Sequence, residues 1–119
     1  MWLERDAALV WHGFTDMAAY LDHRPLVVER AEGHELIDTD GRRYLDAISS
    51  LWVNTLGHRV PELDHAVRAQ LALVAHSTLL GHTNRVVVEL AEALAQVVPV
   101  REPHFLFASD GAAAVEQAL

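Results

Sequence analysis

The 119-residue sequence contains no cysteine and no lysine. Without cysteine the chain can form no disulfide framework, no thiolate metal site and no thiol nucleophile. Its nine basic residues are all arginine, which keeps its proton near neutral pH and cannot supply a Schiff-base amine. No stretch approaches the ~18 uninterrupted apolar residues of a membrane span. The acidic N-terminus also lacks the basic-then-apolar build of a signal peptide, so we expect a cytoplasmic protein.

Positive charge is scarce as well. Seventeen acidic residues against nine basic ones give a net charge of −8, which argues against a nucleic-acid partner that would need its phosphates neutralised. Residues of the hydrophobic set make up 51% of the chain, enough to predict one domain-sized piece with an apolar core. Because no membrane-spanning stretch is present, we also expect no membrane partner.

The first half of the chain combines a short helix with strands. A helix is expected from about Leu3 to His12, with a loop after Gly13. Asp40-Gly41 is a strong hairpin signal because both residues tolerate positive φ. We therefore predict a small antiparallel meander of three β-rich runs, Leu26–Ala31, His34–Thr39 and Arg43–Asp46.

Helical periodicity then takes over. Pro61 suits the first turn of a helix, and Thr83-Asn84 offers a cap for a second helix that Pro99 ends. Apolar residues at helical spacing predict one buried stripe on each helix: Leu63, Ala66, Val67, Leu71 and Val74 on the first, and Val87, Leu90, Leu94 and Val97 on the second.

The last segment is typical of an α/β unit. His104–Ala108 is predicted to be a strand, 109–111 a turn, and Ala112–Leu119 the start of a helix. The chain stops about two turns into that helix, at ~3.6 residues per turn. We interpret the sequence as the opening part of a larger α/β protein.

The turn before the final helix is a candidate anion site. Free backbone N–H groups and the positive end of the helix dipole attract phosphate, and Gly111 and Ala112 add little bulk there. The residues alone favour the plainer alternative, an ordinary strand-to-helix connection with Asp110 as N-cap. A capping Asp110 would occupy the same amides and repel a phosphate, so phosphate binding requires it to point elsewhere.

Other chemistry is harder to place. Trp52, in the segment 49–54, could wall a pocket, although core packing is the commoner fate of a tryptophan; the same alternatives hold for Trp11 and Phe14. The eight histidines show no metal-ligand spacing, and no glycine pattern frames a nucleophilic serine. We therefore expect no metal site.

Several segments in this order carry a family resemblance: 11–17 (WHGFTDM), Glu32-Gly33, 40–46 (DGRRYLD), 49–54 (SSLWVN), Gly57-His58, 76–84 (HSTLLGHTN) and 108–116 (ASDGAAAVE). Together they resemble the N-terminal part of the class III aminotransferases, which depend on pyridoxal phosphate. The opening 11–15 with 49–52 is most similar to the branch of biotin synthesis. The implied fold is the N-terminal portion of a fold-type I transferase, with 1–60 in the small domain and 61–119 opening the large, cofactor-binding domain.

The resemblance also implies roles for residues. Gly111 and Ala112 match the pair that holds the cofactor phosphate, while Trp52 and Phe14 match positions lining the substrate pocket. The complete enzyme would be a homodimer, with 76–84 near its interface, and would convert 7-keto-8-aminopelargonate to 7,8-diaminopelargonate. Leu51 stands where some relatives have a second tryptophan, so the amino donor stays open between S-adenosylmethionine and lysine.

The family's catalytic lysine lies far downstream, so the resemblance places no catalytic residue in this chain. We expect the 119-residue piece to be inactive by itself. Two alternatives stand beside this reading. One is another class III ω-aminotransferase, against which the segment 11–15 argues, and the other is a non-catalytic acidic interaction remnant.

Overall fold

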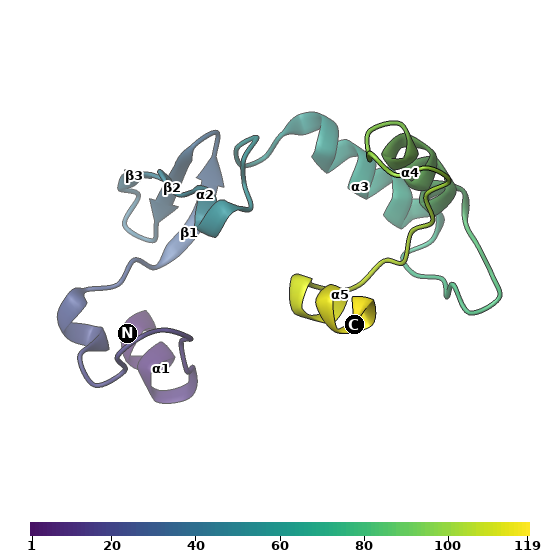
Figure 1. Ribbon diagram of the computed structural model, residues 1–119. Helices are drawn as coiled ribbons and strands as arrows, with labels where there is room; N and C mark the ends of the chain where they lie inside the picture. Colours follow the sequence, from purple (N-terminus) through teal and green to yellow (C-terminus); the bar gives the residue numbers. More distant parts are fainter. The chain divides into compact units, whose positions relative to one another are not determined.

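The computed structural model describes residues 1–119 as two compact units, Met1–Leu71 and Ala72–Leu119 (Figure 1).

The N-terminal helix is shorter than predicted. In the first unit, α1 (Trp2–Leu9) is followed by a single 3-10 turn, η1 (Tyr20–His23). The predicted helix is confirmed, but it ends at Leu9 because Val10 adopts an extended backbone. His12, expected within the helix, instead lies in the loop that follows.

The predicted meander is confirmed. Strands β1 (Val28–Glu32), β2 (Glu35–Asp38) and β3 (Arg43–Leu45) form an antiparallel sheet in the order β1-β2-β3 (Figure 1). Gly41, at a φ of 81°, forms the expected hairpin turn. The carboxylate of Asp38 holds that turn, because its Oδ1 accepts the backbone N–H groups of Asp40 and Arg42 at 2.9 and 2.8 Å.

The expected apolar core is nearly absent. Ile37, on β2, is the one buried hydrophobic side chain, and it is accompanied by two buried carboxylates, Asp38 and Asp46. A core requires two packed layers of secondary structure, whereas the sheet here is a single layer with no helix in contact with it. The expectation of a core was therefore wrong for this stretch of chain.

The predicted helices form, but their apolar stripes are not buried. They are α3 (Pro61–Leu73), α4 (Arg85–Ala95) and α5 (Gly111–Ala118). Asn84 caps α4 by accepting the Val87 N–H at 3.0 Å, and the helix ends at Ala95 instead of continuing to Pro99. No residue of α3 or α4 is buried, because neither helix has an element packed against its apolar side. None of the helices has the length and apolarity that a membrane crossing requires.

The predicted strand at His104–Ala108 does not form. A strand is defined by its pairing, and no segment of the chain pairs with these residues. Residues 103–107 instead line a cavity of about 670 Å³ together with Val87, Val88 and Ala91 of α4. Phe105 and Phe107 stack with their ring centroids 6.5 Å apart.

Candidate functional site

At the start of α5, Asp110 does not point away from the helix. Its Oδ1 accepts the backbone N–H of Ala113 at 2.8 Å, and its Oδ2 accepts the Ser109 hydroxyl at 3.0 Å. Both bonds lower the pKa of the Asp110 carboxyl, and the bond from Ala113 has the larger effect. The structure therefore has the capping arrangement, and the condition set for phosphate binding is not met with Asp110 in this position. Gly111 still leaves open space, since a Cβ added there would meet nothing within 4 Å.

Trp52 belongs to a turn with an uncommon backbone. Helix α2 (Ser49–Trp52) has positive φ at all four residues, between 47° and 71°, so it is a left-handed turn. Left-handed backbone costs roughly 1–2 kcal/mol per non-glycine residue, so the turn persists only if its surroundings hold it. The Trp52 side chain is 80% exposed, which rules out core packing within this chain.

The group that holds α2 is a buried carboxylate. Asp46 follows β3, and its Oδ1 accepts the backbone N–H of Ser50 at 2.8 Å. Its Oδ2 accepts the Ser50 hydroxyl at 2.8 Å and lies 2.7 Å from Nε2 of His58. The bonds from Ser50 and His58 outweigh burial and lower the pKa of Asp46. The ionised carboxylate can only accept, so Nε2 of His58 carries the proton. We call Asp46, Ser50 and His58 the Asp46 cluster.

His58 is itself fixed to the sheet. Its backbone pairs with Gly33, the residue after β1, through two hydrogen bonds of 2.6 and 3.1 Å. Gly57 makes this close approach possible, because it has a φ of 92° and a Cβ there would lie 2.8 Å from the carbonyl oxygen of Gly33. The β1–β2 turn thus positions His58, which in turn contacts Asp46.

Phe14 is presented in a similar way. It has a φ of 55° and a fully exposed side chain, so it is not a core residue of this chain either. The preceding loop is held by His12, whose Nε2 lies 2.7 Å from Oδ2 of Asp6 and whose ring stacks on Tyr20. Hydrogen bonds from Tyr20 and His12 lower the pKa of Asp6. Phe14 and Trp52 share exposure and positive φ, but no contact between them is seen.

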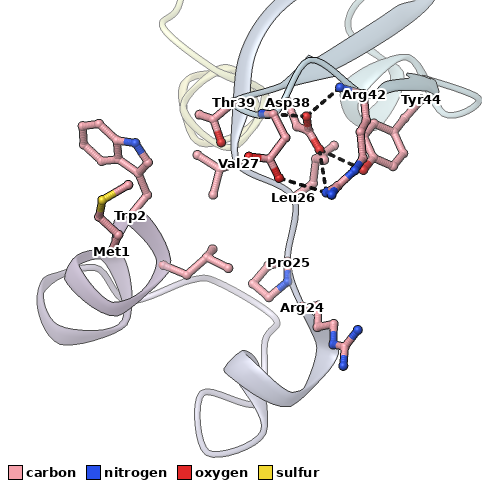
Figure 2. Close-up of a pocket in the computed structure, with 12 residues that line it drawn as sticks. Met1, Trp2, Arg24, Pro25, Leu26, Val27, Asp38, Thr39, Arg42 and Tyr44 are labelled. Atoms are coloured by element: carbon pink, nitrogen blue, oxygen red, sulfur yellow. Dashed lines mark hydrogen bonds and ion pairs between the residues drawn. The ribbon is translucent and has the colours of Figure 1, made fainter.

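A cavity of the first unit, lined by residues of α1, β2 and β3, contains none of the predicted site residues. Figure 2 shows this cavity of about 500 Å³, with Trp2 and Leu26 on its apolar side. The polar groups on its other side bond to one another: the Tyr44 hydroxyl donates to Asp38 at 2.9 Å, and Arg42 pairs with Asp40 at 2.9 Å. We assign no ligand to it. No group of three or more histidine, aspartate or glutamate residues is arranged to hold a metal ion.

The sequence profile of the family "Aminotransferase class-III" matches residues 17–119. The chain belongs to the class III aminotransferases. It is 48% identical, over 96% of its length, to the adenosylmethionine-8-amino-7-oxononanoate aminotransferase of Nitratidesulfovibrio vulgaris, of which it covers 21%. The chain thus spans 21–26% of the length of the curated relatives that share this name.

Solved structures of ω-transaminases confirm the fold class. An (S)-enantioselective ω-transaminase from Thermomicrobium roseum superposes with a TM-score of 0.89 and 36% identity, over 98% of this chain and 26% of that one. The ω-transaminase of Pseudomonas jessenii, solved in complex with PMP, superposes with a TM-score of 0.88 and 28% sequence identity. The match covers 97% of this chain and 26% of that one. The chain is therefore the N-terminal portion of this α/β fold.

Sequence reasoning missed the Asp46 cluster. Asp46 and His58 are twelve residues apart, and no spacing rule connects them. Two local signals were present: Gly57, which permits the positive φ, and the polar pair Ser49-Ser50 placed directly after a strand.

Proposed function

We propose that the full-length protein is a pyridoxal-phosphate-dependent aminotransferase of biotin synthesis. It converts 7-keto-8-aminopelargonate to 7,8-diaminopelargonate, with S-adenosylmethionine or lysine as the amino donor. The observation that carries this proposal is the group of relatives at 39–48% identity that share the name adenosylmethionine-8-amino-7-oxononanoate aminotransferase. The full-length protein acts in the cytoplasm as a homodimer, with 76–84 near the interface.

Within this chain, Gly111 and Ala112 would hold the cofactor phosphate. When bound, the cofactor supplies an electron sink for the amino-group transfer. The open approach at Gly111 and the first turn of α5 suit an anion, whereas the Asp110 carboxylate opposes one. The opposition is electrostatic, because the cap occupies the Ala113 amide while its negative charge lies beside the Gly111 and Ala112 amides, and we derive no step of the reaction through this site.

Trp52 and Phe14 form the substrate wall of the proposed enzyme. Both are large, exposed and carried on backbone of positive φ, as expected for side chains whose partner is a ligand. The aliphatic chain of a pelargonate would bury apolar area against such rings.

The function is tested by assaying the purified full-length protein with 7-keto-8-aminopelargonate and each donor separately, and by detecting 7,8-diaminopelargonate by mass spectrometry. Product with either donor supports the proposal and identifies the donor. Turnover confined to other ω-amino substrates would contradict it. That outcome would favour the second candidate, a general ω-transaminase, which the structural match to the Thermomicrobium roseum enzyme supports.

Removing the charge of Asp110 tests the phosphate site. Asparagine caps a helix as well as aspartate does, so Asp110→Asn keeps the helix start while removing an anion beside the phosphate. We expect the Kd of the apoenzyme for pyridoxal phosphate to fall about fivefold, which corresponds to about 1 kcal/mol of like-charge repulsion. Fluorescence titration of the apoenzyme with pyridoxal phosphate measures this Kd.

Glu116→Gln is the matched control, because it removes one negative charge from the same helix, α5, away from its N-terminus. We expect it to leave the Kd unchanged. If both variants lowered the Kd for pyridoxal phosphate equally, the change would come from the net charge of the protein and not from the position of Asp110. Weaker binding by Asp110→Asn would contradict the placement of the phosphate at Gly111 and Ala112.

The 119-residue chain alone is expected to form no covalent side-chain adduct with the cofactor, because it has no lysine. We expect borohydride treatment of the chain with pyridoxal phosphate, followed by peptide mass spectrometry, to label at most the α-amine of Met1. Detection of any labelled side chain would overturn the expectation that this piece is inactive by itself.

A further inference from the structure

The left-handed turn α2 places a bulky exposed residue, Trp52, on backbone that it would not adopt unaided. The bonds within the turn do not select this hand, since a right-handed turn forms the same i to i−4 pattern. The additional contact that the turn has is with the Asp46 carboxylate, which binds both the backbone N–H and the hydroxyl of Ser50 at 2.8 Å.

The carboxylate in turn has a second anchor. Side-chain exposure is 4% for Asp46 and 14% for His58, and Nε2 of His58 lies 2.7 Å from Oδ2, the same oxygen that accepts the Ser50 hydroxyl. A carboxylate with both oxygens bonded cannot rotate without breaking a charge-assisted hydrogen bond. Because the backbone of His58 is tied to Gly33, the turn carrying Trp52 is registered against the sheet.

We propose that Asp46 and His58 are positioning residues for Trp52: they hold α2 in its left-handed form and thereby set the orientation of the substrate wall. This rests on the proposed function for its effect on KM, but not for its effect on the geometry of Trp52. Their side-chain hydrogen bonds are to Ser50 and to each other and not to Trp52, so we expect loss of either to weaken substrate binding without entering the chemical step.

The test uses the full-length protein labelled with 5-fluorotryptophan, with the Trp52 resonance assigned by its absence from Trp52→Phe. His58→Leu removes the N–H that binds Asp46, and His58→Gln restores an N–H donor of similar reach. We expect His58→Leu to shift the Trp52 fluorine resonance and to raise the KM for the keto substrate about tenfold with kcat little changed. His58→Gln should recover most of both.

Tyr44→Phe is the matched control, because it also deletes one side-chain donor to a buried carboxylate on the same sheet, the Asp38–Tyr44 bond of 2.9 Å. It should move neither KM nor the Trp52 resonance. Equal effects of His58→Leu and Tyr44→Phe would overturn the proposal, as would an unmoved Trp52 resonance in His58→Leu.

Two further outcomes are decisive. If His58→Leu does not fold, Ser50→Ala, which loses only the hydroxyl bond to Asp46, must shift the Trp52 resonance in comparison with Tyr44→Phe, or the proposal fails. If the wild-type protein turns over no keto substrate, the proposed function fails. The fluorine resonance in His58→Leu and His58→Gln then decides the positioning role alone.

Discussion

Replacing Gly57 by alanine is expected to destabilise the full-length protein by about 2–4 kcal/mol. Two costs add at this position. The φ of 92° strains any L-residue, and the new Cβ would lie 2.8 Å from the carbonyl oxygen of Gly33, a backbone atom that cannot rotate away. Relief requires residues 57 and 33 to separate, which breaks the two hydrogen bonds between His58 and Gly33. Urea unfolding followed by circular dichroism measures the loss.

Gly41→Ala separates the two costs. Gly41 has a comparable φ of 81°, but a Cβ added there meets nothing within 4 Å. We expect this variant to lose only the backbone term, about 1–2 kcal/mol. If Gly57→Ala and Gly41→Ala lowered the free energy of unfolding equally, the close contact between residue 57 and Gly33 would contribute nothing. The pairing of His58 with the sheet would then not depend on that close approach.

Features fixed by a few neighbouring residues were predictable. The β2–β3 hairpin follows from Asp40-Gly41, the start of α3 from Pro61 and that of α4 from Asn84, because turns and caps depend on residues within four positions. The strand at His104–Ala108 and the buried helix stripes were wrong for one common reason. Both depend on partners distant in sequence: no strand pairs with 104–108, and the segment 103–107 only lines an open cavity with α4 without burying its stripe.

The candidate site divides in the same way. The roles proposed for Gly111, Ala112, Phe14 and Trp52 come from the resemblance, and no contact within the chain assigns them. The Asp46 cluster is visible only in the structure, because left-handed backbone at four non-glycine residues contradicts local propensity. Asp46 is only four residues from Ser50, but its anchor His58 is twelve residues away and is itself paired with Gly33. Strained backbone that is held in place by its surroundings is what a functional turn is expected to show.

Truncating Trp52 to alanine is expected to raise the KM for 7-keto-8-aminopelargonate about thirtyfold or more, as for a hot-spot aromatic worth at least 2 kcal/mol. The side chain is 80% exposed in this chain, so little packing is lost when it is removed. The free energy of unfolding should therefore change by less than about 0.5 kcal/mol. Steady-state kinetics with varied keto substrate, alongside urea unfolding, separates binding from stability.

Trp11→Ala supplies the comparison, because Trp11 is 89% exposed and has no role in the proposed substrate wall. Its removal changes the same number of aromatic atoms at a similar exposure, so a general effect of deleting a surface tryptophan would appear in both variants. A KM raised only in Trp52→Ala assigns the loss to substrate contact. Equal kinetics in the two variants would remove Trp52 from the substrate wall, while the Asp46 cluster would still have to be explained as a purely structural device.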